Sequence, residues 1–199
     1  MARITNSMTA GELLRQLEED PEYVLQKAER DKELQEREAQ SRAAQKPLLE
    51  DLAKVGVDVT SVWDLVNTSS PYPSALPVLL DHLQKPYPDG VREGIARALA
   101  VRATRPIGWQ ILMDEYLKTD VSNQRVKDGL AVALAGASDE TTLTDLIELA
   151  KDKSHGSSRV LLLLGLKRVT QPGAKQAIVG LANDPQLAKE IKSWRKNRE

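Results

Sequence analysis

The sequence contains no cysteine, and this absence excludes disulfide bonds, thiolate metal ligands and a cysteine nucleophile. Phenylalanine is also absent, and aromatic residues make up only 4% of the chain. The hydrophobic core must therefore be built from Leu, Val, Ile and Ala, which commonly fill the space between packed helices.

Long apolar runs are missing as well. The longest uninterrupted one is Val160–Leu164, which is too short to span a membrane, and residues 1–11 contain no run typical of a signal peptide. A net charge of −1 gives no overall attraction to nucleic acid or to an anionic membrane. Together with the lack of cysteine, these features predict a cytoplasmic protein without a membrane partner.

The N-terminal part of the chain differs in composition from the rest. We expect a disordered lead over residues 1–8 and an N-terminal helical region over residues 9–71. From Glu22 to about Arg42 the chain consists almost entirely of good helix formers with charges of both signs and a thin apolar stripe. This pattern predicts a long, mostly solvated helix, and a docking or self-association arm is the alternative interpretation.

After a Ser/Pro linker over residues 68–73, a paired-helix pattern recurs. Three windows align without gaps at offsets of 35 and 32 residues, namely 91–100, 126–135 and 158–167. The segments expected to form the first helix of each pair also align, namely 75–83, 109–117, 142–150 and 174–182. A repeat of this length is typical of stacked helix pairs, each burying its apolar face against its neighbours. We therefore expect an all-α chain in which residues 72–199 form a short right-handed α-solenoid of about four antiparallel helix pairs.

The second-helix windows resemble the HEAT-repeat (HEAT/armadillo-like) superfamily. The residues that carry this resemblance are Asp89-Gly90-Val91-Arg92, Gly94-Ile95 and Ala98-Leu99, with Val126-Lys127, Gly129-Leu130 and Ala133-Leu134 in the second repeat. The third repeat departs from the pattern at Ser158 and Gly165. The resemblance spans about Tyr72 to Arg198 and extends to uncharacterised bacterial HEAT-like proteins. It implies stacked helix pairs but no single activity, because the superfamily includes adaptors, lyases and DNA-repair enzymes.

The second helices line the inner face of such an array. If Val91 and Ile95 face the core, the charged positions of these helices face outward. The predicted binding residues on this inner face are Arg92, Glu93, Arg97, Lys127, Asp128 and Arg159. For the basic ladder of Arg92, Lys127 and Arg159 a structural role is the favoured interpretation, because the resemblance implies an arginine that bridges neighbouring repeats through a capping aspartate, and recognition of phosphate or acidic partner groups is the alternative.

The same register leaves four aliphatic side chains facing outward in the C-terminal half of the groove, at Val132, Val160, Leu163 and Leu164. Leaving such a patch in water is costly, so we expect a cover. The amphipathic helices within residues 9–55 are the favoured cover, and an external partner is the alternative. A slipped register, which would place these side chains in the core, is the remaining interpretation.

No catalytic or metal-binding constellation is visible in the sequence. The two histidines, His82 and His155, lie in different repeats and lack metal-ligand spacing. A set of Ser157, His155 and Asp152 would share one turn with nothing to orient it. Phosphate-binding loops, dinucleotide fingerprints and nucleophile elbows are absent from the sequence. We therefore expect no metal, no cofactor and no catalytic residue.

These observations predict a non-enzymatic adaptor or scaffold that holds a protein or peptide on the inner face of the array. Nucleic-acid binding, as in the HEAT-like DNA glycosylases, is the alternative and would use the basic edge of Arg92, Lys127 and Arg159. The near-zero net charge argues against it. A lyase or a chaperone for a pigment or cofactor is a third hypothesis, and no specific residue of the sequence supports it.

Overall fold

The computed structural model describes residues 9, 11, 16 and 19–196, and every regular element in these residues is a helix. The prediction of an all-α chain is confirmed. The disordered lead expected over residues 1–8 lies outside the described residues. The chain divides into two compact units, Met1–Ala43 and Ala44–Glu199, which are described separately below.

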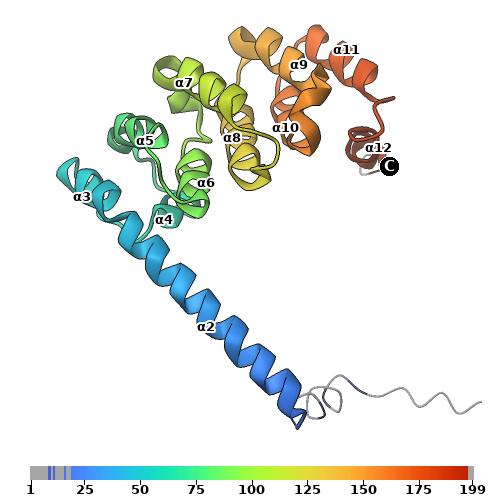
Figure 1. Cartoon of the computed structure of the whole chain (residues 1–199). Helices are drawn as coiled ribbons and strands as arrows, with labels where there is room; N and C mark the ends of the chain where they lie inside the picture. Colours follow the sequence, from blue (N-terminus) through green and yellow to red (C-terminus); the bar gives the residue numbers. More distant parts are fainter. Residues whose placement is uncertain (1–8, 10, 12–15, 17–18, 197–199) are drawn as a thin grey trace, which may run out of the picture. The chain divides into compact units, whose positions relative to one another are not determined.

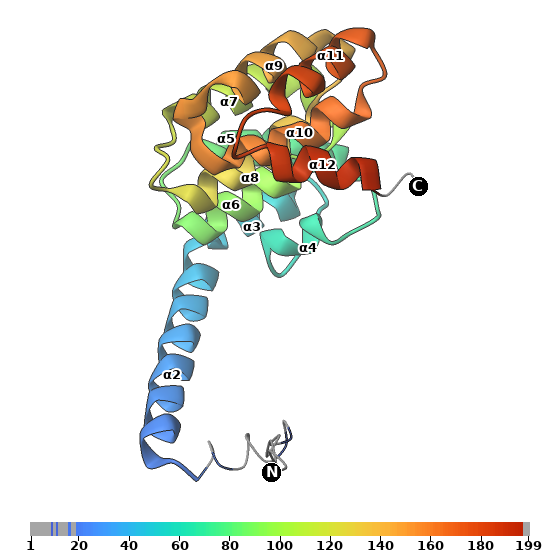
Figure 2. The same cartoon turned by 90° about the vertical axis from the view of Figure 1, so that its right-hand side faces the viewer.

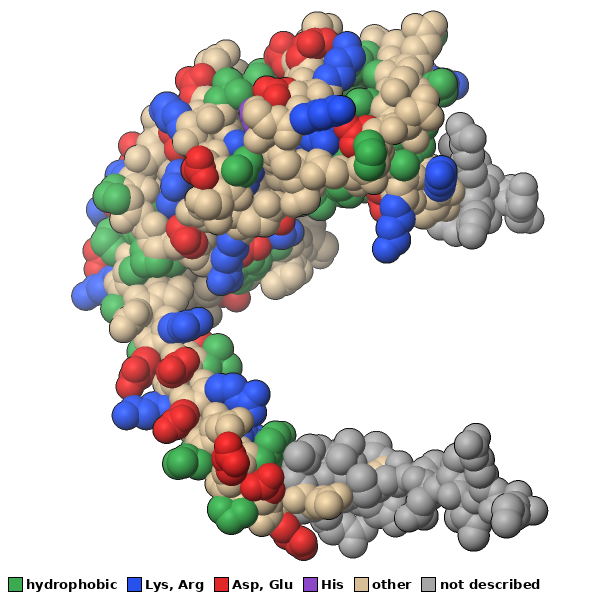
Figure 3. Space-filling model, turned by 45° about the vertical axis from the view of Figure 1, so that its right-hand side comes forward, with side chains coloured by type: hydrophobic (Ala, Val, Ile, Leu, Met, Phe, Trp, Pro, Cys, Tyr) green, Lys and Arg blue, Asp and Glu red, His purple; other side chains and the backbone are tan. Residues whose placement is uncertain are grey.

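The first unit consists mainly of α2 (Pro21–Ala44), which corresponds to the long charged helix predicted from the sequence. Pro21 begins the helix, and the Asp20 carboxylate accepts a hydrogen bond from the Glu22 amide at 3.0 Å. None of its residues is buried. Figure 3 shows acidic and basic side chains interspersed along α2, with hydrophobic side chains between them. Its helicity therefore depends on helix propensity and on local pairs such as Lys32–Glu36, since no buried face supports it.

The second unit consists of helices joined by short connections (Figure 1). Its α-helices are α3 (Lys46–Lys54), α4 (Val62–Val66), α5 (Leu76–Leu83), α6 (Asp89–Ala98), α7 (Arg105–Lys118), α8 (Gln124–Ala137), α9 (Leu143–Lys151), α10 (Arg159–Arg168), α11 (Pro172–Leu181) and α12 (Ala188–Lys196). Short 3-10 helices lie between them, namely η1 (Pro73–Ala75), η2 (Arg102–Thr104), η3 (Glu140–Thr142) and η4 (Lys153–Ser158).

Local sequence signals explain where several of these helices begin. A proline occupies the first turn of α3, α5, α7 and α11, where its missing amide proton costs nothing. Ser61 and Asp64 form a capping box at the start of α4. The Asn123 side chain caps α8 by accepting a hydrogen bond from the Val126 amide at 3.3 Å.

The helices of the second unit pack in two rows. In the first row, α5 packs against α3 and α7, and α9 packs against α11. In the second row, α6 packs against α4 and α8, and α8 also packs against α10 (Figures 1 and 2). Contacts of α5 with α6, α7 with α8 and α9 with α10 join the two rows. Fully buried aliphatic side chains such as Leu79, Ile95 and Leu130 form the core.

The helices over residues 46–66 belong to this packed unit. α3 packs against α5 and buries Leu48 and Leu52, while α4 packs against α6 and buries Val62 and Leu65. The compact unit therefore begins at Ala44, before the start of the array predicted at residue 72. The apolar face of α3 is occupied by this packing, so residues 46–54 are not available as the cover expected for the groove.

The helices of the second row approach one another closely. A Cβ atom added to Gly129 would lie 3.1 Å from the backbone oxygen of Glu93, and one added to Gly136 would lie only 2.2 Å from the backbone oxygen of Ala100. The backbones of α6 and α8 can therefore come this near only because these two positions lack a side chain.

Candidate binding pocket beside the second helices

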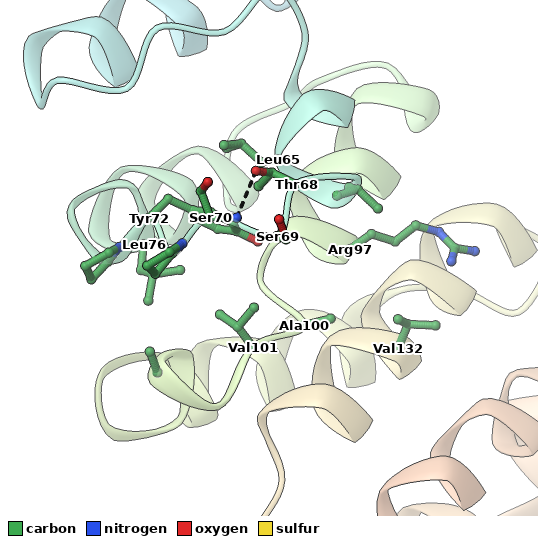
Figure 4. A pocket seen from close by; sticks show the side chains of 14 residues that line it. Leu65, Thr68, Ser69, Ser70, Tyr72, Leu76, Arg97, Ala100, Val101 and Val132 are labelled. Atoms are coloured by element: carbon green, nitrogen blue, oxygen red, sulfur yellow. Dashed lines mark hydrogen bonds between the residues drawn. The ribbon is translucent and has the colours of Figure 1, made fainter.

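A cavity of about 480 Å³ lies beside α4, α6 and α8 in the second unit. Its residues are mainly apolar or hydroxyl-bearing and come from these helices, the 68–73 linker and the turn after α6. They are Leu65, Val66, Thr68, Ser69, Ser70, Pro71, Tyr72, Pro73, Leu76, Arg97, Ala100, Val101, Ala103 and Val132. Figure 4 shows Leu65, Thr68 and Ser69 across the cavity from Ala100, Val101 and Val132. An apolar cavity with few polar groups is the usual form of a binding site.

The 68–73 linker forms one wall of this cavity because two hydrogen bonds hold it in place. The Tyr72 hydroxyl donates to the carbonyl oxygen of Ala98 at 2.8 Å, and the Ser70 amide donates to the Thr68 hydroxyl at 3.1 Å (Figure 4). Burial raises the pKa of Tyr72, so the hydroxyl keeps its proton and remains a donor near neutral pH. The linker is therefore tied to the end of α6.

A charged cluster lies at one end of the cavity. The Arg97 Nε atom donates to the Glu93 carboxylate at 2.9 Å, and Arg125 of the next second helix pairs with the same carboxylate. Arg97 lines the cavity and extends beyond it in Figure 4. Its side chain is 31% exposed, against 11% for that of Glu93. The Arg97 guanidinium is therefore the charged group of the cluster that a ligand in the cavity can reach.

Asp128 lies on the same face, one turn along α8 from Val132. Its carboxylate accepts a hydrogen bond from Gln124 at 2.6 Å. Burial raises the pKa of Asp128, and the nearby Arg97 charge opposes this shift. Three of the six predicted site residues, Glu93, Arg97 and Asp128, thus lie together beside the cavity.

Arg92 belongs to a different contact. Its guanidinium pairs with Glu115 of α7 at 3.0 Å, and Lys118 binds the same carboxylate at 3.1 Å. The Arg92 Nε atom is buried and has no hydrogen-bond partner among the residues that the structure describes. Arg92 therefore bridges neighbouring helix pairs, but its partner is a glutamate of α7 and not the capping aspartate expected from the sequence.

Lys127 is buried, although the sequence register predicted it on the outward face. Its ammonium group donates to the carbonyl oxygens of Tyr116 and Thr119, at 2.9 and 2.6 Å, and lies 4.5 Å from the centroid of the Tyr116 ring. Burial lowers the pKa of Lys127. The side chain satisfies carbonyl groups at the C-terminal end of α7, a position where helices commonly attract cations.

Arg159 is 1% exposed, and like Lys127 it donates to a carbonyl group at the end of the first helix of its pair. It donates to the Ala150 carbonyl oxygen at the end of α9 at 3.1 Å, and it pairs with Asp184 at 2.9 Å and with Gln186. The arginine thus joins α9 to the connection between α11 and α12. Like Lys127, it is buried within the second unit and does not face outward as predicted.

The prediction that certain side chains of the second helices face outward is wrong at several positions. It assumed that one side of each second helix remains in contact with solvent. Side-by-side packing of α6, α8 and α10 covers both flanks, so Ala96, Ala131 and Leu163 are also fully buried. Val132 and Val160 are partly exposed, and Leu164 is 38% exposed. The continuous apolar patch of four side chains predicted from the sequence is therefore broken at Leu163.

The histidines do not form the catalytic set considered from the sequence. His155 Nε2 lies 3.6 Å from Asp152, while Ser157 is exposed and the buried Ser158 hydroxyl donates to the His155 carbonyl oxygen at 2.8 Å. His82 lies elsewhere, bonded to Asp51 at 3.0 Å and to Tyr87 at 2.7 Å. Within residues 19–196 and the three described residues before them, no cluster of three or more His, Asp or Glu side chains could hold a metal ion.

Sequence reasoning missed the wall of the cavity formed by Leu65 and the 68–73 linker. The available signal was Tyr72, an aromatic residue in a chain with few of them, placed between two prolines at the end of a Ser/Pro segment. The partners Glu115 and Asp184 were also missed, because carboxylates in distant repeats carry no local signature.

Comparisons with models of known protein families, with curated proteins and with solved structures found no match to this chain. Among the described residues, no helix is long and apolar enough to cross a lipid bilayer.

Proposed function

We propose that this chain is a non-enzymatic cytoplasmic adaptor in which residues 44–199 act as a short right-handed HEAT-like solenoid that holds a protein or peptide segment. Two observations support the solenoid: the serial packing of first and second helices, and the repeated role of Lys127 and Arg159 in satisfying the end of the paired first helix. The observation that carries the binding proposal is the cavity of about 480 Å³ between the 68–73 linker, α6 and α8.

The chemistry of the cavity favours a peptide with an apolar side chain. Leu65, Val101 and Val132 provide apolar walls, while the hydroxyls of Thr68 and Ser69 and the irregular backbone of the linker provide polar groups. An extended peptide needs partners for its own amide and carbonyl groups, and this wall offers them. The Arg97 guanidinium at the end of the cavity adds a preference for a nearby carboxylate.

The nucleic-acid alternative receives less support. It relied on a basic edge of Arg92, Lys127 and Arg159, but Lys127 and Arg159 are buried and their charges are used within the fold. Binding to a phosphate backbone requires several accessible cations, and the affinity of such contacts falls steeply with salt. A duplex that bound the full chain at physiological salt would restore this alternative.

The proposal is tested by selecting peptides from a displayed random library on the full chain and measuring their affinity. Val132→Trp, which fills the cavity, and Arg97→Ala, which removes its guanidinium, should each weaken binding by at least about tenfold. The matched controls are Leu117→Trp and Arg168→Ala, since both residues are exposed and neither lines the cavity. Selected peptides that bind all four variants equally would overturn the assignment of this cavity, provided that the thermal midpoints are unchanged.

A further inference from the structure

A second cavity, of about 360 Å³, lies in the last part of the array and is separate from the candidate binding pocket. The end of α10, the loop after it, α11 and α12 form its walls. Most of its surface is aliphatic or aromatic, including Leu166, Ile178, Ile191 and Trp194. Val179, which also lines the cavity, is 63% exposed, although it lies on a helix that packs against α9 and α10. This region thus leaves apolar surface open to water, which is characteristic of interaction sites.

Among the described residues that line this cavity, the charged ones are two lysines, Lys167 and Lys175. Both are exposed, and in the described part of the chain neither forms an ion pair with a carboxylate. The Lys167 Nζ atom lies 4.7 Å from the centroid of the Trp194 ring, above the apolar wall. By contrast, Arg92, Arg97 and Arg159 each have an acidic partner within the fold. The cavity therefore combines apolar walls with positive charge that no carboxylate in the described residues neutralises through an ion pair.

Glu190, the acidic residue bonded to the Trp194 ring, forms no ion pair with either lysine in the described part of the chain. Glu190 on α12 accepts a hydrogen bond from the Trp194 indole nitrogen at 2.7 Å, which fixes the orientation of the ring, and Glu190 does not line the cavity. A ligand seated between the lysines would therefore meet a net positive rim. Charge complementarity requires acidic groups on that ligand.

The walls also restrict the backbone conformation of a bound segment. Most lining residues lie in α10, α11 and α12, whose amide and carbonyl groups are largely used in helical hydrogen bonds. An extended peptide placed there would leave many of its own backbone groups without protein partners, whereas a helix satisfies them internally. The apolar walls can accept large side chains one turn apart along such a helix.

We propose that this cavity docks an acidic amphipathic helix of a partner protein. Large aliphatic side chains of that helix enter between Ile178 and Trp194, and its flanking Glu or Asp side chains pair with Lys167 and Lys175. The site is independent of the peptide site proposed beside α6 and α8, so either can fail without the other.

The test uses the full chain and a fluorescein-labelled synthetic helix that has leucine on one face and glutamate on the flanks. Its affinity is measured by fluorescence anisotropy. The double variant Lys167→Glu/Lys175→Glu should weaken binding by at least about tenfold, and Val179→Asp should weaken it as well. The matched charge control is Lys151→Glu/Lys153→Glu, two exposed lysines outside the cavity, which should leave the affinity within about twofold of the unmodified chain.

Further measurements test whether another kind of ligand binds in this cavity. Binding of the acidic helix should weaken with increasing salt, and a sequence-matched helix with lysine in place of glutamate should not bind. The proposal is overturned if the charge-reversed chain binds the acidic helix as well as the unmodified chain does. It is also overturned if the acidic helix fails to bind while sodium decanoate does, since the site would then hold a small anionic amphiphile. Thermal unfolding of each variant establishes that lost binding does not reflect lost structure.

Discussion

The Nζ atom of Lys127 lies 2.6 Å from the carbonyl oxygen of Thr119, and the side chain that carries it is 3% exposed. A second hydrogen bond, to the Tyr116 carbonyl oxygen, completes the attachment of α8 to the end of α7. A lysine is thus held inside an apolar array because it satisfies two carbonyl groups that the helix end leaves open.

Lys127→Met should destabilise the protein by about 2 kcal/mol, because it keeps the aliphatic stem but leaves both carbonyl groups buried without a donor. The free energy of unfolding is measured by urea denaturation. Lys118→Met is the control, since Lys118 is an exposed residue at the end of α7, and the expected change there is within about 0.5 kcal/mol. Equal effects of the two substitutions would contradict the role given to Lys127.

Two glycine substitutions should change stability in opposite directions. Gly136→Ala places a Cβ atom 2.2 Å from the backbone oxygen of Ala100, so α6 and α8 must separate. The expected loss is roughly 2–3 kcal/mol. Gly180→Ala meets no heavy atom within 4 Å on an exposed position of α11, and it should stabilise the protein by about 0.5–1 kcal/mol through helix propensity.

Urea denaturation measures both glycine variants, and circular dichroism checks that their helix content is kept. A Gly136→Ala protein as stable as the unmodified chain would show that the second helices are not in close backbone contact. A destabilising Gly180→Ala would show that the surface of α11 is covered at that position.

The sequence repeat predicted the helix pairs because the repeated positions perform repeated packing tasks. Gly94 and Gly129 occupy the same place in two aligned windows, and each faces the preceding second helix, at Val62 and at Glu93 respectively. The same alignment does not show where a long side chain ends. The side chains of Lys127 and Arg159 fold back and bind the end of the first helix in their pair. The sequence pattern cannot distinguish such a buried side chain from a lysine or arginine that extends into solvent.

The sequence pattern shows no repeat over α3 and α4, because α4 has only five residues, too few for its periodicity to be recognised. Pro47 was the usable signal, since it occupies the first turn of α3 as Pro77 and Pro106 do in α5 and α7. The pocket beside α6 could not be predicted at all from periodicity. It depends on the hydrogen bond between Tyr72 and Ala98, which joins a linker to a helix end 26 positions away.

A third prediction concerns the hydrogen bond between Asp51 of α3 and His82 of α5. The pKa of Asp51 is lowered to about 2, first by its hydrogen bond with Lys54 and then by that with His82. Because the folded value lies below the ordinary 3.8, the Asp51 carboxylate stabilises the fold above about pH 4. This contribution is lost as the pH falls toward 2.

Asp51→Asn removes the charge and keeps the shape of the side chain. The variant should be less stable than the unmodified chain at pH 5, and the difference in unfolding free energy should shrink steadily between pH 4 and pH 2. Lys54, His82 and Lys85 are the titratable groups nearest to this contact, and all are retained. Asp58→Asn, at an exposed position, is the control and should show a smaller difference at pH 5. A difference for Asp51→Asn that is the same at pH 5 and pH 2 would contradict the ion-pair role of Asp51.

The last prediction concerns where the array begins. A chain that starts at Ala44 retains the whole second unit, whereas a chain that starts at Tyr72 lacks α3 and α4. The shorter chain would expose the faces of α5 and α6 that Leu52 and Val62 cover, and each aliphatic side chain of this kind contributes about 1.5–3 kcal/mol when buried. We expect the chain from Tyr72 to melt several degrees lower and to bind the dye anilinonaphthalene sulfonate, while the chain from Ala44 keeps the midpoint of the full protein. Equal midpoints for the two shortened chains would mean that α3 and α4 add nothing to the array, and the start predicted at residue 72 would then hold.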